Sequence, residues 1–490
     1  MFDYLKKAVN HSVLYGISNS LVNLAGLLLL PIYAKYLSPE EFGVFTTINI
    51  SGAILGIIYD MGLIGSLNSH YFDYSEAEEL DRKLIASTIL IFYFLFSSIS
   101  TIILFFFSGG ISALLFKGDN EYSDIVRLML IITYINLLTG VPLSIVRLKQ
   151  KAFAFMFISF LRVSSLLIFS LLFLIFLKES LFGLYKAQII SSAAALVVVF
   201  LLTHNDFIFK FSLAQIKKML AYGLTYFPTI IFVWVINFSD RYLLNYFSTL
   251  EEVGIYSFGY KIAQIVYIFV ISLLGGWNPI LFSIVKEDNA KEILSRMMTY
   301  FFLVVSSLVL FISIFSEEIV TVVSVGKYVE SYRMVPIVSL SYLLYGVYVF
   351  LFCGLMVTKK IKSQPIIIGI SAFINIILNI ILIPKFGYMG AALSTLFTYC
   401  VVVIGTYVVS QKHFYISYEM IRLFKITAVA FFIYFMHYYK IFNYVMLAGI
   451  FGNLVLFMLF FYILYILRFF DLTEINKIKS IFRPIILKGI

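Results

Sequence analysis

The chain has 490 residues, of which 62% are hydrophobic and only 13% are charged. So few charged side chains cannot cover the surface of a water-soluble protein of this length, which excludes a soluble enzyme or binding protein. The formal net charge of +10 does not indicate a nucleic-acid partner, because the basic residues are spread over many short segments instead of forming one basic face.

Apolar runs long enough to cross a bilayer recur along the whole chain. A transmembrane helix needs roughly 20 apolar residues, whereas outer-membrane barrels show short alternating segments. We therefore expect an all-α polytopic membrane protein with about fourteen transmembrane helices. The expected spans are residues 13–36, 43–67, 84–107, 125–146, 153–177, 183–203, 220–246, 253–283, 297–316, 335–357, 365–383, 388–410, 423–439 and 443–467.

The basic residues are biased toward one side of the membrane. Most of the 36 Lys and Arg residues lie in every second connection between the expected spans. The positive-inside rule then predicts that both termini are cytoplasmic and that the number of spans is even.

The sequence contains an internal repeat. "YLSPEEFGVFTT" at 36–47 matches "YFSTLEEVGIYS" at 246–257 with an offset of 211 residues, and weaker similarities keep nearly the same offset. Because the offset spans six expected helices, the two copies are parallel and related by a pseudo-two-fold axis along the membrane normal. The predicted domains are an N-terminal six-helix lobe at 1–203, a cytoplasmic amphipathic linker at 204–219, a C-terminal six-helix lobe at 220–410, and two additional helices with a basic cytoplasmic tail at 411–490.

The acidic turns "SPEE" and "TLEE" open two of the expected spans. Ser38 or Thr249 can cap the first turn of a helix, the glutamates suit the positive end of the helix dipole, and the following glycine permits close packing. We interpret this repeated motif as part of the scaffold and not as a site.

Charged residues inside the expected spans are the main candidates for a functional site. Each costs roughly 2.5–3.5 kcal/mol in hydrocarbon even on the most lenient scale. For those near a span end, a local ion pair or a side chain reaching the interface is an alternative explanation. Arg162 and Lys261 lie deeper, and for them we favour a water-filled path. The candidates are Asp60, Arg162, Lys186, Asp240, Arg241 and Lys261.

Polar residues on the same helix faces extend the candidate path, although such residues often serve helix packing. The candidates are Asn19, Asn23, Asn237 and Gln264. The repeat offset places Lys261 opposite Ile50, so the scaffold is duplicated and the charges are not. This asymmetry predicts a net cationic cavity between the lobes, which attracts anions and phosphate groups in particular. No nucleotide-binding or metal-binding motif stands out, and we expect no cofactor.

Three stretches, "DRYLLNYFSTLEEVGIYSFGYKIAQI" at 240–265, "YLSPEEFGVFTTI" at 36–48 and "YDMGL" at 59–63, resemble the polysaccharide-transporter branch of the multidrug/oligosaccharidyl-lipid/polysaccharide exporter superfamily, which includes O-antigen flippases. "GWNPILFS" at 276–283 is also similar to that branch. The resemblance implies a V-shaped bundle of two lobes in the bacterial inner membrane. It also implies a transporter, not an enzyme, that moves undecaprenyl-pyrophosphate-linked oligosaccharide, such as an O-antigen or capsule unit, to the outer leaflet by alternating access.

The resemblance also implies cationic residues in the lumen, and Arg162, Arg241 and Lys261 are the matching candidates here. The expected partners are the lipid-linked oligosaccharide and the bilayer, together with a polysaccharide polymerase and a chain-length regulator. One alternative is a cation-coupled multidrug exporter, for which Asp60 is the candidate acidic group. Another is a membrane-embedded polysaccharide polymerase or acyltransferase, which would need a large outer loop or clustered catalytic residues.

Overall fold

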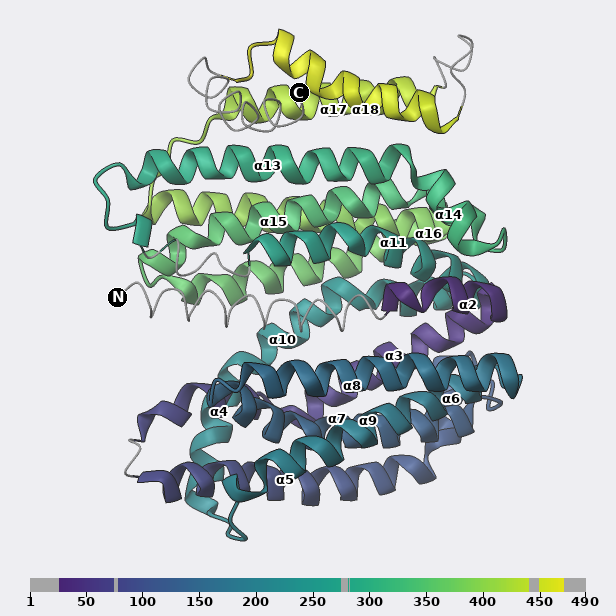
Figure 1. Cartoon of the computed structure of the whole chain (residues 1–490), viewed down its shortest axis with the longest axis vertical. Coiled ribbons are helices and arrows are strands. Elements are labelled where there is room, and N and C mark those ends of the chain that lie inside the picture. The colour runs from purple at the N-terminus through teal and green to yellow at the C-terminus, as the bar shows by residue number, and fades with distance from the viewer. Residues whose placement is uncertain (1–25, 75–77, 275–280, 282, 440–448, 471–490) are drawn as a thin grey trace, which may run out of the picture.

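The computed structural model describes residues 26–74, 78–274, 281, 283–439 and 449–470. Within this part of the chain all regular secondary structure is helical (Figure 1). The elements are α2 (Leu30–Tyr36), α3 (Pro39–Asp60), α4 (Leu63–His70), η1 (Tyr71–Asp73), α5 (Glu79–Phe106), α6 (Ser108–Leu115), α7 (Ser123–Leu148), α8 (Ala152–Leu171), η3 (Leu172–Phe176), α9 (Leu181–Thr203), η4 (His204–Asp206), α10 (Leu213–Phe247), α11 (Leu250–Leu274), α13 (Ala290–Ile314), α14 (Ser316–Ser324), η5 (Val329–Arg333), α15 (Val335–Val357), η6 (Ile361–Ser363), α16 (Gln364–His413), α17 (Met420–Tyr438) and α18 (Ile450–Ile466).

Eleven helices in the described residues are long and apolar enough to cross a membrane. One of them, α16, has 50 residues and would be about 75 Å long if straight, more than twice the thickness of a hydrocarbon core. It is interrupted at Gly387, which has φ 54° and ψ −135°, so it contains the two expected spans 365–383 and 388–410. The polytopic all-α fold is therefore confirmed, whereas the number fourteen stays a prediction.

Several expected spans differ from the helices of the structure. The span 43–67 is divided at Met61 and Gly62, which both have positive φ, so α3 ends at Asp60 and α4 follows it. The span 220–246 starts earlier, because Ser212 caps α10 by accepting a hydrogen bond from Gln215 N. The expected linker 204–219 thus ends in the first two turns of α10. The helix of the last expected span, α18, has only 17 residues.

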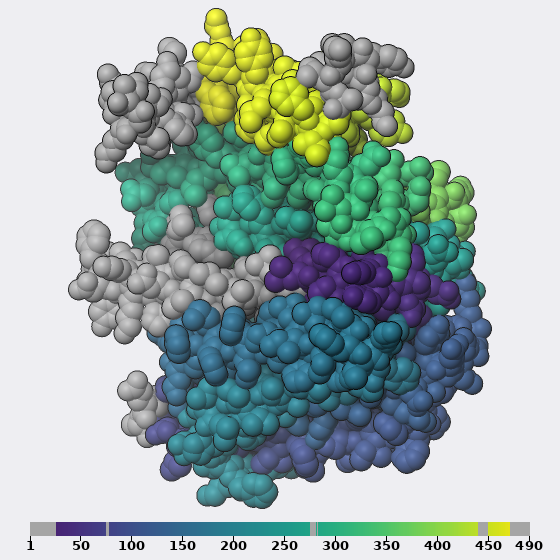
Figure 2. Space-filling view, turned by 45° about the vertical axis from the view of Figure 1, so that its right-hand side comes forward, coloured from purple at the N-terminus to yellow at the C-terminus, as the bar shows by residue number. Residues whose placement is uncertain are grey.

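The long helices form two groups that lie one above the other in Figure 1, which we call the lower bundle (α3–α9, residues 39–203) and the upper bundle (α11–α16, residues 250–413). α3 of the lower bundle packs along α11 of the upper bundle. In the space-filling view α2 reaches the surface between the two bundles (Figure 2). The predicted domain bounds themselves stay a prediction.

The crossing of α3 and α11 depends on two glycines that the repeat makes equivalent, Gly43 and Gly254. A Cβ built on Gly43 would lie 2.0 Å from the backbone oxygen of Leu250, and one built on Gly254 would lie 1.8 Å from that of Pro39. Real Cβ atoms are not found this close to backbone atoms. The two copies of the repeated motif therefore contact each other, as expected for helices that meet near a two-fold axis.

The repeated acidic turns also have the structural role expected for them. Ser38 and Glu41 form a capping box at the start of α3, and Thr249 accepts a hydrogen bond from Glu252 N. Each glutamate also reaches another connection of its own half of the chain. Glu41 accepts a hydrogen bond from Ser180, and Glu252 accepts one from Tyr388 N at 3.1 Å.

α10 joins the two bundles. Its first half packs on α4 and α5 of the lower bundle, and its second half packs on α16 of the upper bundle. Gly223 lies against the backbone of Met61 and Gly62 at the junction of α3 and α4. α17 and α18 lie beyond α13 at the top of Figure 1, where Ile426 and Phe460 are buried together with Leu310 of α13.

Candidate functional site

Lys261 lies on α11, two helical turns after Gly254. Its side chain is partly exposed, and within the part of the chain that the structure describes it has no hydrogen bond or ion pair. A Cβ built on Gly26 would lie 3.5 Å from Lys261 Nζ, so the ammonium group faces the chain just before α2. This lysine is therefore a cation in a membrane-spanning segment that no described carboxylate neutralises.

Arg162 lies on α8 and is also partly exposed. Its Nη2 donates a hydrogen bond to Asn136 Oδ1 of α7 at 2.8 Å. No carboxylate among the described residues forms an ion pair with it. Arg162 and Lys261 are thus both without a described counter-ion, and no described hydrogen bond joins the two.

Asp240 and Arg241 form a buried ion pair near the end of α10. Arg241 Nη1 donates to Asp240 Oδ1 at 2.8 Å, and the hydroxyl of Tyr256 donates to Asp240 Oδ2 at 2.6 Å. The guanidinium lies over the ring of Tyr260, with 4.1 Å between its carbon and the ring centroid. In this conformation the pair neutralises itself, and aromatic rings cover the positive charge, so the local ion pair considered as an alternative is the arrangement present here.

The aromatic partners of Arg241 were not among the candidates from the sequence. Tyr256 and Tyr260 are four residues apart on α11, which places them on one helix face. The ring of Tyr260 contacts that of Tyr342 on α15, at 5.7 Å between centroids. The spacing of the two tyrosines was visible in the sequence, but their position against α10 depends on how the helices cross.

Lys186 and Asp60 both have local partners. Lys186 Nζ lies 2.8 Å from both carboxylate oxygens of Glu179. Asp60 accepts hydrogen bonds from Gly62 N and Ile64 N, both at 3.1 Å, and from the hydroxyl of Tyr93. Asp60 therefore stabilises the turn between α3 and α4.

Of the two polar candidates that the structure describes, Asn237 makes a hydrogen bond between helices. Asn237 accepts it from the hydroxyl of Tyr399 on α16 at 3.2 Å. Gln264 lies three residues after Lys261 on α11 and is partly exposed. Asn19 and Asn23 lie outside the described residues.

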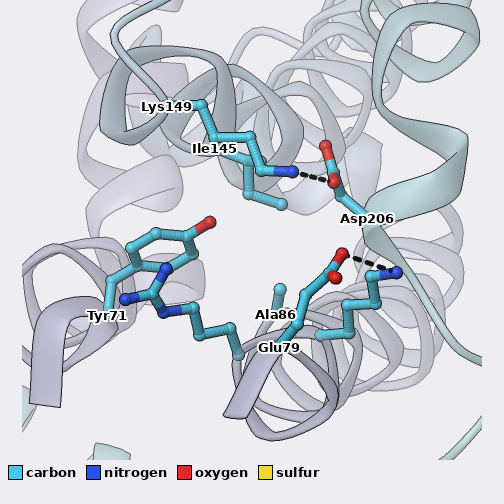
Figure 3. A pocket seen from close by; sticks show the side chains of 8 residues that line it. Tyr71, Glu79, Ala86, Ile145, Lys149 and Asp206 are labelled. Carbon is cyan, nitrogen blue, oxygen red and sulfur yellow. Dashed lines mark hydrogen bonds and ion pairs between the residues drawn. The ribbon is translucent and has the colours of Figure 1, made fainter. Parts of the chain in front are cut away.

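A second cluster of polar residues lines a small pocket at the end of the lower bundle, where η1, α5, η4 and the end of α7 meet (Figure 3). Lys149 donates a hydrogen bond to Asp206 across it. Burial alone would lower the pKa of Lys149, but the hydrogen bond and the charge of Asp206 raise the pKa overall. Burial raises the pKa of the Tyr71 hydroxyl. The guanidinium of Arg82 lies over the ring of Tyr71. The cluster therefore links the segments that follow α4, α7 and α9 in the lower bundle.

Comparison with known proteins decides the family. A family model described as polysaccharide biosynthesis protein matches residues 9–285, which is more than half of the chain. This chain belongs to that family. The resemblance to the polysaccharide-transporter branch that the sequence predicted is therefore confirmed. A curated protein similar to this chain is an uncharacterized membrane protein, MJ1068, of Methanocaldococcus jannaschii, which is 26% identical over 258 residues.

The match to MJ1068 covers 49% of this chain and 49% of the archaeal protein, so the chain spans about half the length of the curated relative it matches. Solved structures resemble nearly the whole fold. The lipid II flippase MurJ in an inward closed conformation has a TM-score of 0.74 and 17% identity, covering 97% of this chain and 100% of that chain.

Multidrug transporters of the MATE family are also similar. An inward-facing member of the MOP superfamily has a TM-score of 0.65 and 14% identity, covering 80% of this chain and 94% of its own. A mutant form of the Vibrio cholerae MATE transporter VcmN has a TM-score of 0.59 and 14% identity, covering 83% of this chain and 96% of its own. At these identities the likeness concerns the fold.

Proposed function

We propose that this family member is a flippase that moves a lipid-linked oligosaccharide across the membrane by alternating access. The observation that carries the proposal is the ammonium group of Lys261, which lies in a membrane-spanning helix without a described counter-ion. Membership of the polysaccharide biosynthesis family and the fold shared with the lipid II flippase MurJ support the same proposal.

The comparison of Lys261 with Arg241 explains why an unpaired cation is informative. A buried charge without a partner is strongly unfavourable, and proteins usually neutralise it with a carboxylate. Asp240 does so for Arg241 at 2.8 Å. Since the described residues offer Lys261 no such partner, its ammonium group needs water or an anionic ligand, as expected for a residue that lines a transport path.

The proposed ligand is an undecaprenyl-pyrophosphate-linked oligosaccharide, such as an O-antigen or capsule repeat unit. Its pyrophosphate is a compact anion, which ammonium and guanidinium groups bind well. Its lipid tail remains in the bilayer while the head group crosses. Lys261 and Arg162 are the proposed anion-binding residues, and Gln264, one helical turn from Lys261, is a further residue of the path.

The location, the topology and the lobe bounds in this proposal are those expected from the sequence. The protein lies in the bacterial inner membrane with both termini in the cytoplasm, and its two six-helix lobes, 1–203 and 220–410, alternate between inward-open and outward-open states. A polysaccharide polymerase and a chain-length regulator would act on the delivered unit. A cation-coupled multidrug exporter is less well supported, because the acidic candidate Asp60 is engaged by Gly62, Ile64 and Tyr93.

Substitution of Lys261 tests the proposal. Lys261→Ala should strongly reduce surface polysaccharide at unchanged protein level, and Lys261→Arg should retain a substantial part of it because the positive charge is kept. Lys186→Ala is the matched control, since Lys186 is already paired with Glu179. Normal polysaccharide in Lys261→Ala, measured in a strain that lacks the wild-type chain, would contradict the proposal.

A further inference from the structure

Two exposed lysines occupy equivalent places in the internal repeat. Lys117 follows α6 and Lys327 follows α14, and these two helices lie on the right-hand side of the molecule in Figure 1. They are 210 residues apart, close to the 211-residue offset of the repeat. Each is followed five residues later by a tyrosine, Tyr122 or Tyr332. The repeat thus predicts related surroundings for the two ammonium groups.

Each lysine reaches across to the other half of the chain. Lys327 Nζ, which belongs to the upper bundle, donates hydrogen bonds to the backbone oxygens of Lys35 at 2.9 Å and Leu37 at 3.3 Å. Lys117 Nζ, which belongs to the lower bundle, donates to the backbone oxygen of Ser248 at 2.8 Å. The contacts are therefore reciprocal.

The acceptors are also equivalent. Leu37 is the C-terminal cap of α2, and Ser248 is the C-terminal cap of α10; they are 211 residues apart. The last carbonyl groups of a helix have no partner within the helix, and they carry the negative end of its dipole. A lysine ammonium is suited to such a position. Each lysine therefore completes a helix end that belongs to the other half of the chain.

These two contacts lie where α3 and α11 cross most closely. α3 starts directly after the Leu37 corner and α11 directly after the Ser248 corner, and Gly43 and Gly254 form the crossing. A third residue, Tyr328, adds a buried contact, because its hydroxyl donates to the backbone oxygen of Ser38 at 2.9 Å. Separation of α3 from α11 at this end is therefore expected to pull the lysines away from these acceptors.

We propose that Lys117 and Lys327 are a matched pair of latches that holds this end of the transport path closed and sets how often it opens. The inference rests on the proposed function, since it assigns the latched end to the extracytoplasmic side and the opening to alternating access. When the bundles separate, the ammonium groups and the helix carbonyl groups form hydrogen bonds with water instead of with each other.

Exposure makes the latches reversible. Both lysine side chains are exposed, and an exposed cation at a helix terminus contributes only modestly, so that the closed state is favoured without being permanent. Removal of both latches is expected to raise the open fraction about tenfold, which corresponds to about 1.4 kcal/mol. Removal of one is expected to raise it about threefold.

Thiol labelling tests the inference independently of polysaccharide synthesis. Ser51 of α3 is half-buried and its hydroxyl lies 2.6 Å from that of Tyr242 on α10. Ser51→Cys therefore reports on the space on the cytoplasmic side of the crossing between α3 and α11. In a chain with Cys353→Ala and Cys400→Ala, a membrane-impermeant maleimide added from outside should label Ser51→Cys about ten times faster in the Lys117→Met/Lys327→Met variant.

Two further variants separate a latch from a general effect on the surface. Lys385→Met removes an exposed lysine that follows Pro384 and should leave the labelling rate unchanged. Replacing both latch residues by arginine, which also donates hydrogen bonds, should keep the rate near that of the parent. An unchanged rate in the double methionine variant would overturn the latch.

The labelling result stands apart from the transport result. Faster labelling of Ser51→Cys in the double methionine variant, together with normal polysaccharide in Lys261→Ala, would support the latch and contradict the proposed flippase. Reduced polysaccharide in Lys261→Ala, with no change of labelling when both latch lysines are removed, would support the flippase and overturn the latch.

Discussion

Replacing Gly254 by alanine is expected to force α3 and α11 apart. A Cβ built there lies 1.8 Å from the backbone oxygen of Pro39 and 2.7 Å from its carbonyl carbon. Unbonded atoms of this kind prefer separations of about 3.5 Å, so the two helices must move apart locally by about 1.5 Å. Because both neighbours are backbone atoms, rotation of a side chain cannot relieve the contact.

Overpacking of this kind costs about 1–3 kcal/mol of unfolding free energy. Gly65→Ala is the matched control, because Gly65 lies inside α4 and a Cβ there would meet nothing within 4 Å. Alanine stabilises an exposed helix interior by up to about 1 kcal/mol relative to glycine. Gly254→Ala is therefore predicted to lower stability, whereas Gly65→Ala is predicted to leave it unchanged or to raise it.

Thermal unfolding of the purified protein in detergent measures this difference. Gly254→Ala should lower Tm relative to the wild type, and Gly65→Ala should leave Tm unchanged or raise it. The same Gly254→Ala change should increase labelling of Ser51→Cys from outside. If Gly254→Ala melts at the wild-type temperature and leaves Ser51→Cys protected, the close crossing of α3 and α11 is refuted.

Two other predictions concern charges with local partners. Asp240→Asn alone should reduce the amount of folded protein, because it leaves the Arg241 guanidinium buried without a counter-ion. Adding Arg241→Met should recover part of the loss. Thermal unfolding of the wild type, the single variant and the double variant checks this, and an equal loss in the single and double variants would argue against the ion pair. Asp60→Ala should lower Tm because it removes the carboxylate oxygens that accept hydrogen bonds from Gly62 N and Ile64 N, a loss of about 1 kcal/mol of stability. Asp60→Asn should recover part of this loss. An unchanged Tm in Asp60→Ala would show that the turn does not depend on these two hydrogen bonds.

The repeated motif was informative because its function is local. Capping at Ser38 and Thr249 depends on residues three positions away, so the sequence predicted it and the structure contains it. The contact between Gly43 and Gly254 needs the crossing of two helices 211 residues apart. The repeat indicated that such a symmetric contact was available, but its closeness follows only from the packing.

Two local signals in the sequence mark helix ends that the expected spans do not match. An aspartate followed two residues later by glycine, as at Asp60 and Gly62, is typical of a turn in which the side chain accepts a backbone N–H. Ser212 followed by Gln215 is typical of a helix start. Both signals would have placed the end of α3 and the start of α10 correctly.

Whether a charged candidate is neutralised depends partly on contacts between residues that are far apart in the sequence. Neighbours such as Asp240 and Arg241 usually point to different sides of a helix, and their pairing is stabilised by Tyr256, which comes from the next helix. The absence of a described counter-ion at Lys261 is likewise a tertiary property. The sequence could identify these residues as costly in a membrane, but only packing separates a neutralised charge from a free one.

Chemical restoration of the charge at position 261 tests the central claim most directly. In a chain without the native cysteines Cys353 and Cys400, Lys261→Cys should lose surface polysaccharide, and 2-aminoethyl methanethiosulfonate, which attaches an ammonium group to the thiol, should restore it. The neutral methyl methanethiosulfonate should not. A thiol that remains unmodified, or a modified protein that restores polysaccharide equally well with the neutral reagent, would contradict a water-exposed cation that binds an anionic head group.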